Sequence, residues 1–315
     1  MEDAILTFAK QFEYVPVIEN KERLKKTDKF VLIGMGGSHL CADILRCAYP
    51  SFDFIIHRNY GLPKVPDYFL ENALIILSSY SGETEEVLEA LEEGLSRGVN
   101  MAVMTDRGTL LDRAKEEGLP YIDLPNPGIE PRSAIGYATL ALTHLIDHTE
   151  AFDMLKTLSQ TLTPQDYRTE GEQLAQGLEG SIPVIYSSAQ NYAVSYNWKI
   201  KLNETGKLPA FFNVFPELNH NEMSAYDAIG PYTFIFIEDA NDHPRILKRM
   251  EVLKGMLTER GYTVLTSIMK GDTVFERIFS SLLVADFMAL AIANKKGIDG
   301  AATPLIAEFK EKIKT

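Results

Sequence analysis

The most restrictive feature of the sequence is an alternation that begins at Phe30. Short apolar runs are followed by a glycine or polar turn and then by a segment with helical periodicity, and this order repeats along the chain. The pattern is typical of α/β proteins with parallel sheets, because strands that are covered by helices on both faces are apolar along their whole length. We therefore expect parallel sheets flanked by helices.

In the first half, the expected strands are the near-continuous apolar runs 30–33, 54–56, 74–77, 101–104 and 121–123. The expected helices, which have helical spacing of apolar residues, are 38–48, 84–97, 109–117 and 133–148. A polar stretch with little strand character follows at 150–180, and we place a domain boundary inside it.

After this stretch the alternation restarts. The expected strands are 182–186, 211–214, 233–237 and 263–268, and the expected helices are 192–203, 244–260 and 274–296. Pro244 stands where a helix would begin, a position that proline favours. Each half opens with a strand, a turn and a helix, so the sequence predicts two domains, 1–152 and 153–315.

Charge narrows the classes of partner. The 315 residues carry 31 Lys and Arg against 44 Asp and Glu, a formal net charge of −13. This charge repels a nucleic acid backbone, so we expect no nucleic acid partner. It does not exclude a small phosphate, which a few well-placed donors can hold.

Other features bear on location and metal content. The N-terminal Met-Glu-Asp has no basic region followed by an apolar stretch, which predicts a cytoplasmic protein. The apolar run 274–293 is interrupted by Glu276, Arg277 and Asp286, so we interpret it as a core helix and expect no membrane partner. Cys41 and Cys47 lie on different faces of one predicted helix and are expected to be buried free thiols, and no Cys/His cluster indicates a metal.

The first expected strand leads into a glycine turn, Gly34–His39, which reads Gly-Met-Gly-Gly-Ser-His and precedes a helix. Backbone N–H groups at such a helix start indicate an anion site. The turn lacks the third glycine of the dinucleotide fingerprint, which is His39 here, and the acidic residue expected after the next strand is replaced by His57 and Arg58. No Gly-Lys-Ser/Thr of a Walker A loop follows.

A serine loop, 78–84, follows the third expected strand and reads Ser-Ser-Tyr-Ser-Gly-Glu-Thr. Its hydroxyls could donate to phosphate oxygens, or they could serve as an ordinary helix N-cap. A glycine turn at the end of a neighbouring strand favours the ligand interpretation, because ligands bind at the carboxyl ends of parallel strands.

Together, the glycine turn and the serine loop resemble the sugar isomerase (SIS) domain, a flavodoxin-like module that binds phosphosugars. The resemblance implies two sets of contacts. The phosphate would be held by Ser79, Ser81 and Thr84, and the sugar would lie along Gly36, Gly37 and Ser38.

Three further motifs narrow the resemblance: Pro-Arg-Ser at 131–133, Asn-Glu-Thr-Gly-Lys at 203–207 and Glu-Leu-Asn-His-Asn-Glu at 217–222. In this order they resemble the bifunctional phosphoglucose/phosphomannose isomerases, and the likeness covers essentially the whole chain. It implies an α/β fold of two SIS-type domains, each a parallel sheet flanked by helices. It also implies aldose–ketose isomerisation of glucose, fructose and mannose 6-phosphates.

The residue types suit that chemistry. One carboxylate can move a proton between C1 and C2 through a cis-enediol, and Glu204 is the candidate. His220 is suited to opening the ring, and Arg132 to stabilising negative charge on the enediolate. Each of these residues has a structural alternative. Glu204 could be a helix-end carboxylate paired with Lys201 or Lys207. His220 could be an ordinary turn residue, and Arg132 could brace a helix. Glu222 is a candidate for orienting His220 or a neighbouring helix.

The resemblance also implies roles near the chain end and in a second chain. Lys310, with Lys312 and Lys314 close by, is a second candidate ring-opening group, and Thr303 leaves room for either C2 configuration. A homodimer with shared active sites is implied, in which His220 of the partner subunit reaches in.

Two positions depart from the family pattern. Glu83 stands where asparagine is frequent, and its backbone is the expected ligand contact. Thr205-Gly206 replaces Asn-Ala directly after Glu204, at the end of the expected helix.

We expect no cofactor and no metal. Two other functions compete with isomerisation. One is a phosphosugar-binding protein without turnover, in which the serine loop works but Glu204 and His220 do not. The other is an NADP-linked dehydrogenase that uses the glycine turn and Arg58.

Overall fold

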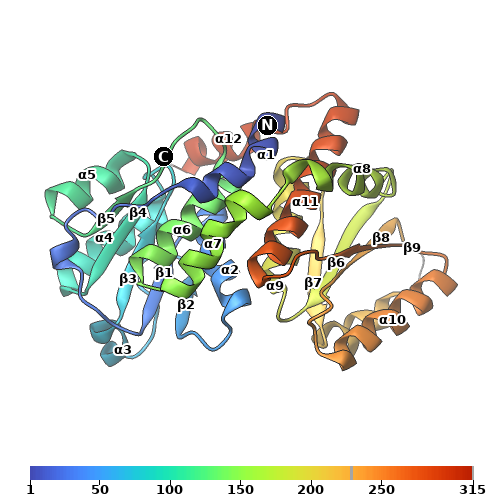
Figure 1. Cartoon of the computed structure of the whole chain (residues 1–315), viewed down its shortest axis with the longest axis horizontal. Coiled ribbons are helices and arrows are strands. Elements are labelled where there is room, and N and C mark those ends of the chain that lie inside the picture. Colours follow the sequence, from blue (N-terminus) through green and yellow to red (C-terminus); the bar gives the residue numbers. More distant parts are fainter. Residues whose placement is uncertain (228–229, 314–315) are drawn as a thin grey trace. The chain divides into compact units, whose positions relative to one another are not determined.

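The computed structural model describes residues 1–227 and 230–313. The chain forms two compact units, here called the N-terminal unit (7–161) and the C-terminal unit (162–315 together with 1–6). The predicted boundary after residue 152 lies inside α7 (Thr149–Thr161), a helix of the N-terminal unit. Both units hold α-helices and parallel strands (Figure 1), so the expected α/β class with parallel sheets is confirmed.

The N-terminal unit contains one sheet of strand order β2-β1-β3-β4-β5 with all pairs parallel. Its strands are β1 (Phe30–Ile33), β2 (Phe54–His57), β3 (Leu74–Ser78), β4 (Met101–Thr105) and β5 (Tyr121–Asp123). Its α-helices are α2 (Leu40–Ala48), α3 (Asp67–Asn72), α4 (Glu85–Arg97), α5 (Gly108–Glu116), α6 (Ile135–Leu145) and α7. Short 3-10 turns occur at Phe8–Glu13, Lys21–Arg23, Gly36–His39 and Pro131–Ser133.

Helices cover both faces of this sheet. On one face, alternate apolar residues of β1, β3 and β4 form a buried core with α3, α4 and α5. On the other face, α2 packs against α6, which in turn packs against α7. Because both faces are covered, β1, β3 and β4 are buried throughout, which explains why the apolar runs predicted these strands. Cys41 and Cys47 are buried in α2 and form no disulfide, as expected.

The C-terminal unit repeats this arrangement with strand order β7-β6-β8-β9, again all parallel. Its strands are β6 (Ile182–Ser188), β7 (Phe211–Phe215), β8 (Tyr232–Glu238) and β9 (Thr263–Ile268). Its α-helices are α1 (Glu2–Leu6), α8 (Arg168–Gln176), α9 (Tyr192–Glu204), α10 (Pro244–Glu259), α11 (Val274–Lys296) and α12 (Pro304–Ile313). Its 3-10 turns are Pro164–Tyr167, Glu217–His220 and Glu222–Ala225.

This sheet is also covered on both faces. Aromatic residues of β6 and β8 pack against α10, while α8 and α9 pack against α11, and Figure 1 shows α10 and α11 on opposite sides of the strands. Pro244 is the first residue of α10, as predicted. Within the described residues, no helix is long and apolar enough to cross a membrane. The run 274–293 belongs to α11, which is almost entirely buried, so its interpretation as a core helix is confirmed.

A buried ion pair joins α9 to α11. Lys201 Nζ lies 2.6 Å from Asp286 Oδ1, and the Lys201 side chain is only 2% exposed. A buried charge needs a partner, because an unpaired ammonium in this environment would lose its hydration without compensation. The pair therefore fixes the register of α9 against α11 one turn before Glu204.

Candidate active site

The glycine turn after β1 makes close backbone contacts that only glycine permits. A Cβ at Gly34 would lie 2.9 Å from the carbonyl oxygen of Ser78, at the end of β3. A Cβ at Gly37 would lie 3.0 Å from the backbone nitrogen of Arg132. Gly36 has a φ of +53°, in the left-handed region that favours glycine. The turn is thus packed between the serine loop and the Pro131–Ser133 turn.

Hydrogen bonds join the glycine turn to the serine loop. Ser78 Oγ donates to the Ser38 carbonyl at 2.8 Å, and the Tyr80 N–H donates to Ser38 Oγ at 3.1 Å. Tyr80 OH donates to the Pro125 carbonyl at 2.7 Å. Burial, with a further contribution from the charge of Asp106, raises the pKa of Tyr80 to about 12, so its phenol remains a neutral donor. The backbone and the side chain of Tyr80 therefore both anchor the serine loop.

Two hydroxyls of the serine loop, those of Ser79 and Thr84, lie together. Ser79 Oγ and Thr84 Oγ1 are 2.7 Å apart, and Ser79 Oγ accepts from the Gly82 N–H. Gly82 has a φ of +70°, and a Cβ there would overlap the Arg107 carbonyl, so this position requires glycine. Thr84 is the N-cap residue of α4 but makes no side-chain capping bond within the described structure. The Thr84 hydroxyl therefore makes no N-cap contact there.

Glu83 turns its carboxylate away from these hydroxyls. Its oxygens accept from the Thr109 N–H at 2.7 Å and from Thr109 Oγ1 at 3.0 Å, at the start of α5. A carboxylate at a helix N-terminus is stabilised by the helix dipole. The side chain therefore anchors the serine loop to α5.

Arg132 lies in the 3-10 turn Pro131–Ser133, beside the glycine turn. Its side chain is only 3% exposed, and Nη1 lies 3.6 Å from a carboxylate oxygen of Glu130. The N-terminal unit thus brings the serine loop, the glycine turn and Arg132 together at the carboxyl edge of its sheet. Hydroxyls, backbone N–H groups and one guanidinium are suitable donors for a phosphorylated polyol.

In the C-terminal unit, Glu204 is the last residue of α9 and lines a pocket of about 570 Å³. Thr303 lines the same pocket, so the structure brings together two of the predicted residues. The pocket is formed by the end of α9, the segment before α12 and the first turn of α12, and its lining comprises Asn203, Glu204, Lys207, Ile298, Asp299, Ala302, Thr303, Pro304, Leu305 and Ile306. A carboxylate at the wall of a pocket can reach a bound ligand.

Two lysines hold the chain around Glu204. Lys207 Nζ donates to the carbonyl oxygens of Glu204 and Ala302, and so ties the end of α9 to the segment before α12. Lys296 Nζ donates to the carbonyls of Gly206 and Lys207, both at 3.1 Å. Cations at a helix C-terminus satisfy carbonyls that have no partner within the helix. Sequence reasoning missed Lys296, and its position in the sequence gives no signal of this contact.

At the Thr205-Gly206 departure, α9 ends with hydrogen bonds to one carbonyl. The N–H groups of Thr205 and Gly206 both donate to the Lys201 carbonyl, at 2.9 and 3.2 Å, which closes the helix directly after Glu204. The two lysines that the helix-end alternative would pair with Glu204 make other contacts. Lys201 pairs with Asp286, and Lys207 donates to backbone carbonyls.

His220 is exposed on a loop that other side chains hold in place. Glu222 accepts from Tyr186 OH at 2.7 Å and from Asn213 Nδ2 at 2.5 Å, which ties the loop to β6 and β7. Arg249 Nη1 donates to Asn219 Oδ1 at 3.1 Å from α10. The loop is therefore anchored on both sides of His220, and its imidazole is presented to solvent.

Glu204 and His220 lie at opposite edges of the C-terminal sheet. Parallel strands β6 and β7 are joined by α9, which runs back across the sheet, so Glu204 lies near the amino ends of the strands. His220 follows the carboxyl end of β7. The 13 residues of α9 span about 20 Å, so the two side chains do not meet within this unit.

Lys310 is exposed on α12. Lys312 pairs with Glu308 at 2.5 Å, whereas no hydrogen bond or ion pair of Lys310 is found within 1–227 and 230–313. Lys314 lies outside the described residues. The apolar side chains of α12 follow one stripe and are all exposed: Leu305, Ile306, Phe309 and Ile313.

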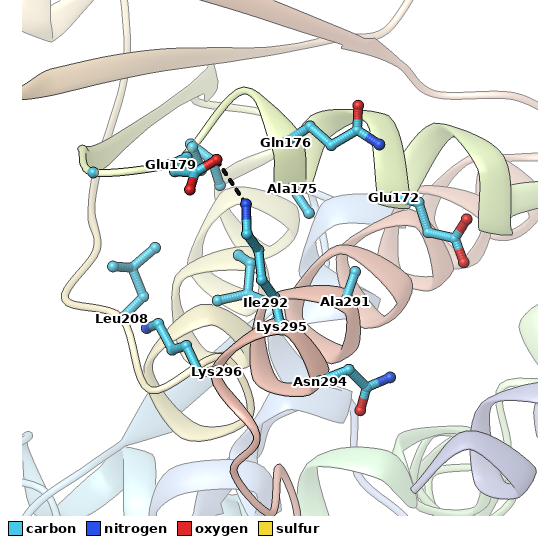
Figure 2. Close-up of a pocket in the computed structure, with 12 residues that line it drawn as sticks. Glu172, Ala175, Gln176, Glu179, Leu208, Ala291, Ile292, Asn294, Lys295 and Lys296 are labelled. Atoms are coloured by element: carbon cyan, nitrogen blue, oxygen red, sulfur yellow. Dashed lines mark hydrogen bonds and ion pairs between the residues drawn. The ribbon is translucent and has the colours of Figure 1, made fainter.

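A second pocket, of about 620 Å³, lies between α8, α11 and the segment after α9 (Figure 2). The ion pair between Glu179 and Lys295, 2.6 Å long, lies at this pocket (Figure 2). None of the residues predicted from the sequence lines it.

Comparisons with known proteins point to one family. Residues 168–313 match the family described as bacterial phospho-glucose isomerase C-terminal SIS domain. The bifunctional phosphoglucose/phosphomannose isomerase of Thermoplasma acidophilum is 31% identical, covering 90% of this chain and 89% of its own. The chain belongs to the bifunctional phosphoglucose/phosphomannose isomerase family.

Other similar proteins extend the comparison. The family member from Aquifex aeolicus is 28% identical over 98% of this chain and 96% of its own length. Among solved structures, glucosamine-6-phosphate deaminase from Thermotoga maritima has a TM-score of 0.70 at 17% identity, covering 96% of this chain and 95% of its own, and so shares the fold.

Proposed function

We propose that the protein interconverts hexose 6-phosphates between aldose and ketose forms, with glucose 6-phosphate, fructose 6-phosphate and mannose 6-phosphate as substrates. The observation that carries this proposal is the convergence of the serine loop, the glycine turn and Arg132 at one sheet edge, in a chain of this family. The decisive experiment supplies fructose 6-phosphate to the purified protein and measures glucose and mannose 6-phosphates. Binding of the phosphosugar without conversion would overturn the proposal.

The residues divide the chemistry among them. Ser79, Ser81 and Thr84 hold the phosphate, and Gly36, Gly37 and Ser38 lie along the sugar. Glu204 moves the proton between C1 and C2 through a cis-enediol, because one carboxylate on one face can both remove and return it. Arg132 stabilises the enediolate charge, since a fixed guanidinium needs little reorganisation.

Ring opening falls to His220, with Lys310 as the second candidate, and Thr303 shapes the pocket wall near the C2 hydroxyl. Thr303 and Glu204 line the same pocket, which supports a shared role. A small side chain at this position accommodates either configuration at C2, which is the basis for including mannose 6-phosphate.

We further propose a homodimer with shared sites. Glu204 and His220 stand at opposite edges of one sheet, so a site that uses both takes His220 of the partner subunit. The apolar stripe of α12 is exposed in a single chain, and a second copy is its proposed partner because the shared site already requires one. Each compact unit corresponds to one SIS-type, flavodoxin-like domain, and the C-terminal match supports this for the second.

The dehydrogenase alternative has less support. Arg58, which would bind the cofactor phosphate, lies 2.5 Å from Asp43 Oδ1, and Asp43 also contacts His39 Nδ1 at 2.6 Å. The guanidinium is thus committed to a buried carboxylate. If the protein binds NADP, the isomerase proposal loses its advantage over this alternative.

Replacing Ser81 by alanine is expected to raise KM for fructose 6-phosphate by about 10- to 100-fold, with a smaller change in kcat. The change removes one hydroxyl donor to a charged phosphate, a contact present in both the ground and transition states. Steady-state kinetics measure it. Ser96→Ala, at the far end of α4, is the control and should leave KM unchanged. An unchanged KM in Ser81→Ala would remove this hydroxyl from the phosphate site.

Replacing Lys207 by methionine is expected to lower kcat by about 10- to 100-fold, because the end of α9 loses its tie to Ala302 and Glu204 loses its position. KM should change less, since the phosphate donors lie elsewhere. Lys207→Arg should restore part of the loss. Lys295→Met, which breaks only the ion pair with Glu179, is the control. A fall confined to thermal stability would assign Lys207 a purely structural role.

A further inference from the structure

The first strands of the two sheets follow the same order. In each sheet, the first strand in sequence pairs with the second strand on one side and with the third strand on the other. By this order β6 corresponds to β1 and β8 to β3. In the N-terminal unit, the ends of β1 and β3 carry the glycine turn and the serine loop. The corresponding ends in the C-terminal unit are the Ser188–Asn191 segment and the Asp239–Asp242 segment.

The two loops of the C-terminal unit are joined by a carboxylate. Asp242 Oδ1 accepts from Ser188 Oγ at 2.5 Å and from Asn191 Nδ2 at 3.2 Å. The same donors, a serine hydroxyl and an amide beside the start of α9, would suit a phosphate oxygen. In the N-terminal unit, the corresponding link runs from Tyr80 to Ser38 through neutral groups.

The side chain of Asp242 lies buried between these two loops. Asp242 is only 7% exposed, and its second carboxylate oxygen, Oδ2, is buried without a hydrogen-bond partner in the described part of the chain. Asp239 is buried beside it and is paired with Arg277 at 3.1 Å. Burial, together with the charge of Asp239, raises the pKa of Asp242. The Asp242 carboxylate already accepts from the Ser188 and Asn191 donors that a further anion would need.

We propose that Asp242 occupies the place in the C-terminal sheet that corresponds to the phosphate site of the N-terminal sheet, so each chain binds a single phosphosugar. The ligand class rests on the proposed function. The second SIS-type domain retains the topology of a phosphosugar module, but its own carboxylate closes the equivalent site.

Binding stoichiometry tests the proposal. A hexitol 6-phosphate, which has no carbonyl and cannot isomerise, is titrated into the full-length protein by calorimetry. One equivalent per chain is expected for the wild type, and none for the combined Ser79→Ala, Ser81→Ala and Thr84→Val variant. A second equivalent in the wild type, or one retained by the combined variant, would overturn the proposal.

A second experiment does not depend on isomerase function. Asp242→Ala leaves Ser188 and Asn191 facing a cavity the size of a carboxylate, so sodium acetate should raise its melting temperature more than sodium chloride of equal ionic strength. The wild type and Asp242→Asn, which keeps an oxygen acceptor, should show no such difference. An equal acetate response in all three proteins would contradict the proposed filling. If the wild type binds no phosphosugar but acetate rescues Asp242→Ala, the proposed function fails and the carboxylate's place in the site stands.

Discussion

Glu204→Gln is expected to abolish measurable isomerisation while leaving hexitol 6-phosphate binding nearly unchanged. Glutamine has the same shape and fills the same pocket wall, but its amide cannot accept the C2 proton. General base catalysis contributes about 10²- to 10⁴-fold, so kcat should fall by at least that factor. The measurements are steady-state kinetics with fructose 6-phosphate and calorimetric titration with the hexitol phosphate.

The matched control is Glu179→Gln. This carboxylate belongs to the same unit, lines the other pocket and pairs with Lys295 at its rim. Its loss should leave both kcat and binding unchanged. Near-normal turnover in Glu204→Gln would refute the assignment of the base, and a parallel loss of phosphosugar binding would indicate that Glu204 positions the substrate instead.

Strand positions were predictable because burial on both faces leaves little freedom in composition. Every expected strand is found within one or two residues, from β1 at Phe30–Ile33 to β9 at Thr263–Ile268. The helix α7 was not expected, because its segment is polar and its buried face depends on only three residues, Ala151, Leu155 and Leu158. The boundary placed at 152 therefore fell inside a continuous helix.

The motifs predicted where chemical groups would lie, but not what supports them. Glu204 ends α9 and His220 follows β7, as the spacing indicated. The lysine contacts at the end of α9 join residues about 90 positions apart. The spacing of apolar residues does not predict contacts over such a distance in the sequence. The carboxylate of Glu83, likewise, is committed to Thr109 by a contact that local sequence does not encode.

The opposite placement of Glu204 and His220 is the structural basis for the proposed shared site. The two motifs follow one another in the sequence, yet β7 lies between them and places them at opposite ends of the strands. Sequence proximity, sixteen positions, is thus a poor guide to proximity in space. The proposed shared site resolves this separation by taking the imidazole from a second chain.

Mixing Glu204→Gln chains with His220→Ala chains is therefore expected to restore activity that neither variant has alone. Random reassociation makes about half of the dimers mixed, and in each of these one of two sites pairs an intact Glu204 with an intact His220. The recovered activity should approach about one quarter of the wild-type value. The baseline is the activity of each variant after the same refolding or exchange treatment on its own. Two differently tagged wild-type chains establish that subunits exchange under these conditions.

The outcome separates two arrangements. If both residues of a site came from one chain, each site in a mixed dimer would carry one defect, and no activity would return even with complete subunit exchange. Recovery that rises with the fraction of mixed dimers requires sites that span two chains. Because the C-terminal sheet holds Glu204 and His220 at opposite edges, recovery is the expected result, and its absence after proven exchange would exclude the shared site.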